Sequence, residues 1–434
     1  PYPQNEKVRN YEFGSEERKS LKRTLLEMSQ KTENIPLILG GKKILEREVV
    51  EVYSPQQKDR IIAKSRQASE EDVSLAINSA LSAWKEWSTL DWQERAAVFL
   101  KAADLITGKY RDVMNASTML GQSKTCYQAE IEAACELADF LRFNVYYASE
   151  IYRQQPMYSP SGQWNKMRAR PLEGFVFAIA PFNFTAISLN LACAPALMGC
   201  AVVWKPAPTA VLSSYYGMLA LEEAGLPPGV INFITGDAEL IGAKVLSHPS
   251  LSGVHFTGST KTFQKVWKSV ANNIEHYKTY PRVVGETGGK DFVFAHPSAN
   301  PDQLVTALVR GAFEYQGQKC SAASRAYIPS SLWKKIREPL IQTTQSLPMG
   351  DPADFKNFLA AVIDERAYKK IKSYIDFAAA SNEAEVICGG ECDDKVGYFV
   401  RPTIIEVKTP KFKTMTEEIF GPVLSIYSYE DENF

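Results

Sequence analysis

The chain has 434 residues, too many for one simple core, so its length predicts two or three domains of ordinary size. Apolar residues make up 45% and charged residues 23% of it, a balance typical of soluble globular proteins. The formal net charge of -1 provides no global field to attract nucleic acid, and no apolar run approaches the roughly 20 residues that span a bilayer. We therefore expect neither nucleic acid nor a membrane as a partner.

The first 150 residues have mainly helical patterns. A charged helix is expected from "SEERKSLKRTLLEMSQK", and "IPLILGGKKI" has the pattern of a hairpin joined by two glycines. At Ser69, "SEEDVSLAINSALSAWKEW" opens with a serine N-cap and an acidic first turn. The stretches "DWQERAAVFLKAADLITG" and "QAEIEAACELADFLRFNVYYASEIY" repeat the helical period. The polar stretch "RQQPMYSPSGQWNKMRARP" predicts an extended hairpin arm with "SPSG" as its turn.

After Gly174 the pattern changes to strands that alternate with helices. Strands are predicted at "FVFAIAP", "AVVWKP", "VINFITG" and "GVHFTGS". This alternation specifies a parallel sheet, in which ligands bind beyond the carboxyl ends of the strands. A second α/β pattern begins at "VVGETGGKDFVFAH", so the predicted fold class is α/β.

Polar residues follow these predicted strands, and each is a weak signal when taken alone. Lys205 is either a solvated surface residue or a ligand for ribose hydroxyls or phosphate. "FTGST" places Gly258 and Ser259 at a helix start, where phosphate binds readily, but the GxGxxG fingerprint is absent. Asn183 is either a turn residue or an amide donor to an oxyanion, and Glu286 is either a surface charge or a base.

Seven cysteines are spread along the chain, and their odd number and low density favour a reducing compartment without a disulfide framework. Cys388 and Cys392, in "CGGEC", have no other cysteine or histidine near them in the sequence, so we predict a turn there and no metal site. Cys320 lies among small residues in "EYQGQKCSAASR" and is either a small buried side chain or a nucleophile.

Six motifs, "PFNFT", "WKP", "FTGS", "GETGGK", "GQKCSA" and "EEIFGPV", occur in the order and at roughly the spacing found in the aldehyde dehydrogenase superfamily. The resemblance covers nearly the whole chain. Within the superfamily, the sequence looks most like the mitochondrial delta-1-pyrroline-5-carboxylate (glutamate-semialdehyde) dehydrogenases. That narrower likeness is carried by "RPLEGFVFAIAPFNFTAI", "EYQGQKCSAASR" and "VGYFVRPTI".

The resemblance implies catalytic roles for three residues. Cys320 would be the nucleophile that adds to an aldehyde, and its own N–H and the amide of Asn183 would form the oxyanion hole. The adduct would pass a hydride to nicotinamide and leave a thioester. Glu286 matches the family's glutamate, the general base for the water that cleaves the thioester.

The resemblance also implies the positions that bind the cofactor, NAD. Lys205 and Glu418 match ribose-binding positions, and Phe420 matches the aromatic residue on the nicotinamide side. Gly258 and Ser259 lie where a phosphate is held.

Two departures from the superfamily bear on the cofactor. Phe263 stands where glycine is common, and Pro208 stands where many NAD-selective members have an acid. Because no carboxylate at that position would repel a 2′-phosphate, NAD rather than NADP is an expectation from the subfamily alone.

For the substrate, the resemblance implies Glu136 as the ligand for the ammonium of glutamate semialdehyde, Phe184 beside its aliphatic part and Ser321 as a donor to its carboxylate. Glu132 lies one helical turn from Glu136 on the same face, so the two could be confused in register. Without the resemblance, a solvated helix face is an equally good interpretation of Glu136.

The implied architecture is aldehyde dehydrogenase-like. It has a parallel-sheet cofactor-binding domain (1–150 and 171–286), a protruding oligomerisation arm (151–170) and an α/β catalytic domain (287–434). Family members continue well beyond Phe434, so we expect the C-terminal part of the catalytic domain to be missing. The chain begins at Pro1 rather than at methionine, so we expect any targeting peptide to have been removed.

The predicted function is the NAD-dependent oxidation of L-glutamate γ-semialdehyde to L-glutamate in proline catabolism. The expected enzyme is a homodimer or higher homo-oligomer in the mitochondrial matrix. One alternative is a dehydrogenase for another semialdehyde, such as succinate semialdehyde. The other is a catalytically silent, truncated relative with a binding or structural role.

Overall fold

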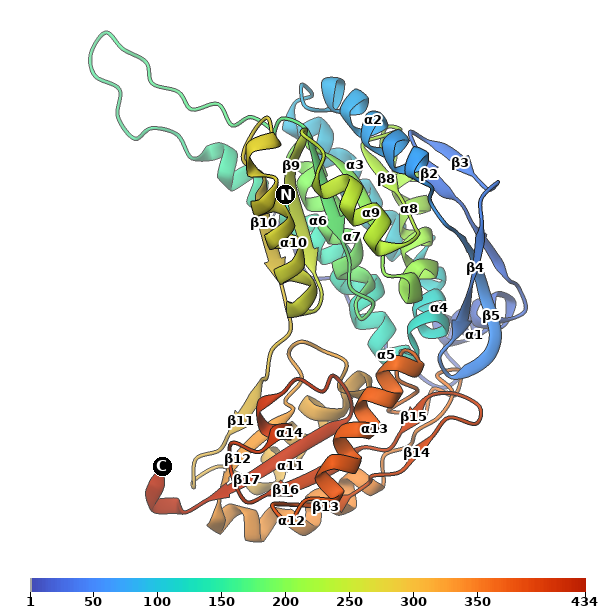
Figure 1. Cartoon of the computed structure of the whole chain (residues 1–434), viewed down its shortest axis with the longest axis vertical. Coiled ribbons are helices and arrows are strands. Elements are labelled where there is room, and N and C mark those ends of the chain that lie inside the picture. The colour runs from blue at the N-terminus through green and yellow to red at the C-terminus, as the bar shows by residue number, and fades with distance from the viewer. Residues whose placement is uncertain (1) are drawn as a thin grey trace. The chain divides into compact units, whose positions relative to one another are not determined.

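The structure, a computed structural model, describes residues 2–434, which form two units (Figure 1). Unit 1 contains the chain up to Val52, Ile62–Thr118 and Ala129–Thr287, and unit 2 contains Tyr53–Ile61, Met119–Gln128 and Gly288–Phe434. Two short segments of the first 150 residues, 53–61 and 119–128, therefore pack with unit 2, although the sequence pattern groups them with the first domain.

Unit 1 is built on a seven-stranded sheet in the order β10-β9-β6-β7-β8-β2-β3. Its parallel strands are β6 (Phe175–Ile179), β7 (Ala201–Lys205), β8 (Ile231–Phe233), β9 (Leu251–Thr257) and β10 (Arg282–Glu286). The chain order reverses at β6, because β7 and β8 follow on one side of it and β9 and β10 on the other. In sheets of this kind, the ligand crevice lies at the reversal, beyond the carboxyl ends of the strands.

The predicted hairpin forms the antiparallel edge of this sheet. Its strands are β2 (Leu37–Leu39) and β3 (Lys42–Ile44). Gly40 and Gly41 join them with φ values of 58° and 79°, which glycine adopts without a steric penalty.

Helices cover both faces of the sheet. Val176 and Ala178 of β6 are buried in one hydrophobic core and Phe175 and Phe177 in another, because successive strand side chains point to opposite faces. The first core contains residues of α3 (Trp92–Thr107), α6 (Leu137–Arg153), α7 (Thr185–Leu197) and α8 (Val211–Ala224). The second contains residues of α2 (Glu70–Trp87), α9 (Ala238–Leu246) and α10 (Thr260–Asn272).

The start of α2 follows its sequence signal, whereas the interior of the helix around residues 128–152 departs from the regular period. The Ser69 hydroxyl accepts the N–H of Asp72, and the Asp72 carboxylate accepts the N–H of Ser69, so the predicted cap of α2 is confirmed. The helix predicted around residues 128–152 is present, but a π-helical stretch, η1 (Glu130–Glu136), lies within it between α5 (Cys126–Ala129) and α6. Glu130 and Glu132 are buried there against partners outside the helix, and these contacts override the 3.6-residue period.

The predicted arm is an extended loop that leaves the body of unit 1 (Figure 1). Its two sides are joined where the Met167 N–H donates to Gln155 Oε1 (3.0 Å) and Gln155 Nε2 donates to the Met167 carbonyl (3.1 Å). At the tip, the Gln163 N–H donates to the Pro160 carbonyl (3.0 Å), one residue later than "SPSG" predicts.

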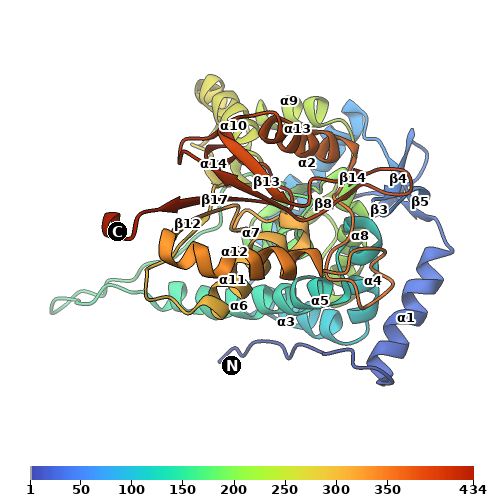
Figure 2. The ribbon, with the colours of Figure 1, turned by 90° about the horizontal axis from the view of Figure 1, so that it is seen from below.

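Unit 2 is built on a five-stranded sheet in the order β11-β12-β17-β16-β13. Its strands are β11 (Phe292–Phe294), β12 (Arg325–Pro329), β17 (Val423–Tyr429), β16 (Thr403–Val407) and the antiparallel edge strand β13 (Ala384–Cys388). Helices α11 (Pro301–Phe313) and α12 (Ser330–Gln345), side by side in Figure 2, cover one face, and α13 (Glu365–Ala379) packs on the other. The second α/β pattern is confirmed, except that its first strand, β10, belongs to unit 1.

The remaining elements are α1 (Glu16–Ser29), α4 (Arg111–Gln122), α14 (Lys413–Thr416), a sheet of β1 (Glu33–Ile35), β5 (Gln57–Arg66) and β4 (Val49–Ser54), and a ribbon of β14 (Cys392–Asp393) and β15 (Phe399–Val400). Within residues 2–434, no helix combines the length and the apolar character needed to cross a membrane.

Candidate active site

The sheet of unit 1 brings the predicted polar residues to one edge. Asn183 follows β6, Lys205 ends β7, Ser259 follows β9 and Glu286 ends β10. The register aligns these strand ends, since Ile179 lies opposite both Lys205 and Phe256, and Thr257 lies opposite Glu286. Four neighbouring strands thus end together at the point where the strand order reverses. This is the edge at which a ligand is expected to bind.

Lys205 is not the solvated surface lysine that a strand end usually carries, because it is only 7% exposed. Burial lowers the pKa of its ammonium, and the Asp237 carboxylate opposes that shift. A buried ammonium is costly unless a ligand or protein group compensates it. Its position therefore favours the ligand-binding interpretation.

The start of α10 has the features of an anion site. The Ser259 hydroxyl caps the helix by accepting the Thr262 N–H (3.2 Å), and the first turn contains no acid. The Gly258 N–H donates to the Glu286 carbonyl (3.1 Å), which ties this turn to the end of β10. The positive end of the helix dipole and its first N–H groups favour a phosphate at this position.

Phe263, the departure from the family pattern, has a packing role in unit 1. Its ring stacks on Phe256, with centroids 5.3 Å apart, and contacts Trp267 edge-on at 5.5 Å. A Cβ at Gly285 would lie 2.2 Å from the Phe263 ring, so the first glycine of "GETGG" is needed to make room for this side chain.

Asn183 lies in the loop before α7 and is 4% exposed. Phe184, half-buried, is the N-cap residue of that helix and has no side chain that can accept a hydrogen bond. Both oxygens of the Glu132 carboxylate accept backbone N–H groups at the start of α7 instead. Sequence analysis did not find this role of Glu132. The signal that could have found it was a buried helix that begins with phenylalanine at its cap.

The contact of Glu132 with the start of α7 distinguishes it from Glu136. Glu132 is buried and engaged with the backbone of α7, whereas Glu136, at the end of η1, is partly exposed. Of the two carboxylates, Glu136 is therefore the better placed for a soluble ligand.

Cys320 lies in unit 2 on a loop that the protein holds in a strained conformation. Tyr315, Gln316 and Gly317, just before it, have φ values of 49°, 54° and 64°. Three consecutive left-handed residues persist only where the surroundings fix them. Here a Cβ at Gly317 would lie 2.2 Å from the Gly421 carbonyl oxygen, so that position requires glycine.

Buried side chains hold this loop. Gln316 Nε2 donates to the carbonyls of Ser123 (3.1 Å) and Ala361 (2.8 Å), and Gln316 Oε1 accepts the Ala360 N–H (3.1 Å). The Tyr315 hydroxyl donates to the Gln122 carbonyl (3.0 Å). These contacts also explain why residues 119–128 pack with unit 2.

The thiol of Cys320 differs from the other cysteines in exposure. All seven cysteines lie within the described residues, and among them Cys320 alone is exposed, with Ser321 exposed beside it. Burial raises the pKa of the Cys193, Cys200 and Cys388 thiols, which makes them poor nucleophiles. The nucleophile interpretation of Cys320 is the one that its exposure favours.

Glu418, also in unit 2, contacts the glycines of "GETGGK". Its Oε1 accepts the Gly289 N–H (3.2 Å), and a Cβ at Gly288 would lie 2.1 Å from Oε2. Burial, with repulsion from Arg325, lowers the pKa of nearby Lys290 to about 8, although Glu418 opposes the shift. Phe420 follows with a φ of 62°, an uncommon conformation for a bulky residue.

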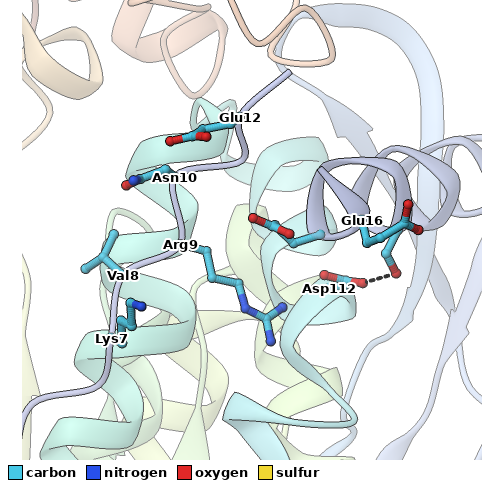
Figure 3. A pocket seen from close by; sticks show the side chains of 9 residues that line it. Lys7, Val8, Arg9, Asn10, Glu12, Glu16 and Asp112 are labelled. Atoms are coloured by element: carbon cyan, nitrogen blue, oxygen red, sulfur yellow. Dashed lines mark hydrogen bonds between the residues drawn. The ribbon is translucent and has the colours of Figure 1, made fainter. Parts of the chain in front are cut away.

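A separate surface cavity of about 660 Å³ lies at the N-terminal segment (Figure 3). It contains none of the predicted site residues. The Ser20 hydroxyl donates a hydrogen bond to the Asp112 carboxylate (2.6 Å) in its lining. Its lining is mostly charged: Lys7, Val8, Arg9, Asn10, Glu12, Glu16, Glu17, Ser20 and Asp112. Across the part of the chain that the structure describes, no group of three or more His, Cys, Asp or Glu side chains is arranged to hold a metal.

Unit 1 is a doubly wound α/β domain with polar residues at the reversal of its sheet, an arrangement typical of nucleotide-binding proteins. Unit 2 is an α/β domain that carries an exposed thiol on a tightly held loop. Residues 44–433 match the model of the aldehyde dehydrogenase family, and the chain belongs to that family.

Two relatives that are similar over nearly the whole chain have the same name. The mitochondrial delta-1-pyrroline-5-carboxylate dehydrogenase of Dictyostelium discoideum is 52% identical over 436 residues, which cover 100% of this chain and 78% of that protein. The human protein of the same name is 47% identical over 431 residues, 99% of this chain and 76% of that protein.

A solved structure confirms the fold. The Delta-pyrroline-5-carboxylate dehydrogenase from Mycobacterium tuberculosis, in a crystal structure bound with NAD, matches with a TM-score of 0.96 and 48% identity. The match covers 100% of this chain and 80% of that chain. The predicted aldehyde dehydrogenase-like fold class is thus confirmed.

Proposed function

We propose that this protein is an NAD-dependent aldehyde dehydrogenase that oxidises L-glutamate γ-semialdehyde, formed from delta-1-pyrroline-5-carboxylate, to L-glutamate in proline catabolism. The observation that carries this proposal is the likeness, over the whole chain, to dehydrogenases named for that substrate, at up to 52% identity. The exposed Cys320 supplies the nucleophile that the reaction needs. A dehydrogenase for another semialdehyde is the alternative within the family.

The reaction follows from the chemistry of three side chains. The Cys320 thiolate forms a C–S bond to the aldehyde carbon, and the carbonyl electron pair moves to oxygen. The Asn183 amide and the Cys320 N–H donate to that oxyanion. NAD would supply the acceptor for the hydride that leaves this carbon, and the adduct on Cys320 would thereby become a thioester. Glu286 then takes a proton from water, whose oxygen displaces the sulfur and releases the carboxylate product.

The residues of the chain fit a dinucleotide. Gly258 and Ser259, at the positive end of α10, would hold a phosphate, and Lys205, whose side chain is buried, would bind ribose hydroxyls through its ammonium. Glu418 would bind a second ribose, and Phe420 would lie on the nicotinamide side. The contact of Glu418 with the Gly289 N–H fixes the carboxylate before any ligand arrives.

The substrate residues are assigned by charge and exposure. Glu136 pairs with the ammonium of glutamate semialdehyde, and Ser321, exposed beside the nucleophile, donates to its carboxylate. Phe184 packs against the aliphatic part. Succinate semialdehyde has no ammonium and would not use Glu136, which separates the two candidate substrates.

The proposal also includes the domain roles, the oligomeric state and the location of the protein. Residues 1–150 and 171–286, apart from the segments 53–61 and 119–128 that pack with unit 2, are assigned to the cofactor-binding domain, 287–434 to the catalytic domain and 151–170 to an oligomerisation arm. The arm carries exposed apolar side chains, including Trp164 at 83%, which supports burial against another copy. The word mitochondrial in the names of two relatives supports a location in mitochondria, which we assign to the matrix. A homodimer or higher homo-oligomer is part of the same proposal.

NADH formation across a panel of aldehydes tests the proposal. The specificity constant should be largest for glutamate semialdehyde, with succinate semialdehyde and a simple aliphatic aldehyde well below it. A preference for succinate semialdehyde would favour the alternative, a dehydrogenase for another semialdehyde. If no aldehyde were oxidised while NAD still bound, the protein would be a binding relative and the proposal would fail.

A further inference from the structure

The start of α7 poses a problem that its own sequence does not solve. The first N–H groups of a helix have no partner within the helix, and a capping side chain normally accepts from them. The cap residue here is Phe184, and Thr185 and Ala186 that follow are fully buried, out of reach of water. An acceptor must therefore come from another element.

Glu132 provides that acceptor. Its Oε1 accepts the Thr185 N–H at 3.1 Å and its Oε2 accepts the Ala186 N–H at 3.0 Å, so one carboxylate serves two consecutive N–H groups. The side chain is 2% exposed. A negative charge also complements the positive end of the helix dipole.

Hydroxyl groups complete the clamp around Thr185. Its Oγ1 donates to Ser213 Oγ of α8 (2.9 Å) and lies 3.0 Å from Thr118 Oγ1 of α4. Glu132 is the charged group in this set, and it comes from the π-helical stretch, a feature often found at functional sites.

We propose that Glu132 is a positioning residue for the oxyanion amide. By fixing the backbone of Thr185 and Ala186, it fixes the two preceding residues, so that the Asn183 amide is held where negative charge develops. The inference rests on the proposed role of Asn183. It assigns to Glu132 a contribution to kcat that acts through Asn183 and leaves the binding of NAD unchanged.

Glu132→Gln is the sharpest change, because its amide can accept from one N–H group but presents an NH₂ to the other. We expect kcat to fall about tenfold, a part of the roughly 10²–10³-fold lost when an oxyanion donor is removed. Glu150→Gln on α6 is the matched control, because it makes the same substitution at a residue whose contact is the surface pair with Arg153, and it should leave kcat unchanged.

A double-mutant cycle with Asn183→Ala distinguishes positioning from general stabilisation. If Glu132 acts through Asn183, the double variant should have the kcat of Asn183→Ala alone, and the dissociation constant of NAD should stay at the wild-type value. A further tenfold loss in the double variant, or an equal weakening of NAD binding, would overturn the inference while leaving the role of Asn183 intact.

Wild-type kcat in Asn183→Ala would instead overturn the role of Asn183, and this inference with it. Should Glu132→Gln fail to fold, Glu132→Asp keeps the charge and withdraws the carboxylate by one methylene. It should show a smaller loss of kcat with the same lack of additivity in the cycle, and additive losses would again reject the positioning role.

Discussion

The loop before α7 in unit 1 and the loop before Cys320 in unit 2 are held by different means. A buried carboxylate, Glu132, fixes the first by accepting two backbone N–H groups. Buried glutamine and tyrosine side chains fix the second, around three left-handed residues. The difference fits the proposed roles. A charge suits the start of a helix, because it complements the positive end of the helix dipole, whereas neutral side chains supply the bonds that hold Tyr315 and Gln316.

The largest effect should come from Cys320→Ala in the unit 2 loop. Because no other exposed thiol can form the adduct, NADH formation should be lost even in a single turnover, with NAD still bound. Rapid-mixing absorbance at 340 nm measures this, and Cys392→Ala, at a partly exposed cysteine, is the control that should remain active. NADH production by Cys320→Ala would remove the covalent scheme.

Glu286→Gln, at the unit 1 edge, should have the second-largest effect. It keeps the shape of the side chain and removes the base, so the steady rate should fall by about 10²–10⁴-fold while hydride transfer remains. A pre-steady-state burst of NADH should precede the slow phase. If Glu286 also takes the thiol proton, the burst will be smaller and raising the pH will restore it. A variant with wild-type turnover would exclude Glu286 from the mechanism.

Gln316→Ala tests directly whether the buried hydrogen bonds of Gln316 hold the loop before Cys320 in place. It removes three buried hydrogen bonds and leaves the Ala360 N–H without its partner, which should lower the free energy of unfolding by about 1–3 kcal/mol. Misplacement of the nucleophile should lower kcat about 10²-fold. Gln342→Ala, whose side chain donates to Glu338 at the surface, is the control for denaturant unfolding and turnover. Equal kcat and equal free energy of unfolding in the two variants would mean that the Gln316 side chain does not position Cys320.

Glu136→Ala tests whether another carboxylate of the π-helical stretch, Glu136, binds the ammonium of the substrate. Loss of a charge-assisted contact costs roughly 1.5–3 kcal/mol, or about tenfold or more in the specificity constant. The loss should appear with glutamate semialdehyde and be absent with a simple aliphatic aldehyde. Equal losses on both substrates would reject the ammonium-binding role.

The smallest effect on turnover at neutral pH is expected from Glu130→Gln. This variant tests how much a buried, paired carboxylate of unit 1 contributes to the free energy of unfolding. The Glu130 carboxylate accepts hydrogen bonds from Arg111, Tyr11, Asn115 and the Arg9 N–H. Burial raises the pKa of Glu130, but the bonds from Arg111 and its other partners outweigh burial and hold that pKa below its ordinary value of 4.5. Breaking such a buried pair costs about 3–5 kcal/mol of unfolding free energy.

The sign of the pH dependence follows from that lowered pKa. The carboxylate is more acidic in the folded state, so it adds stability above pH 4.5 that is lost as the pH falls through the folded pKa. Denaturant unfolding from pH 7 downward should show this loss in the wild type and a flatter profile in Glu130→Gln. If the free energy of unfolding fell with pH to the same extent in both proteins, Glu130 would not be the cause of the pH dependence.

The strand-end residues could be predicted from the sequence because a strand pattern fixes where each strand ends. Lys205, Ser259 and Glu286 lie at the predicted edge for that reason. The burial of Lys205 could not be predicted, since it depends on neighbours distant in the sequence.

Long-range contacts account for what the sequence pattern did not predict. Glu132 meets Thr185 across 53 residues, and Gln316 meets Ser123 across 193, so no local period reveals either contact. The same contacts decide that Glu130–Glu136 is π-helical and that residues 119–128 belong to unit 2. Cys320 itself was recognised through its motif, because a thiol among small residues is compatible with burial or with catalysis.

The central claim, a thioester on Cys320, is tested most directly by mass spectrometry of Glu286→Gln mixed rapidly with NAD and glutamate semialdehyde. The account predicts a protein heavier by one glutamyl acyl group, located on the peptide that contains Cys320, in an amount equal to the NADH burst. NADH formed in stoichiometric amount, with no acyl group on Cys320 at any time point, would contradict it.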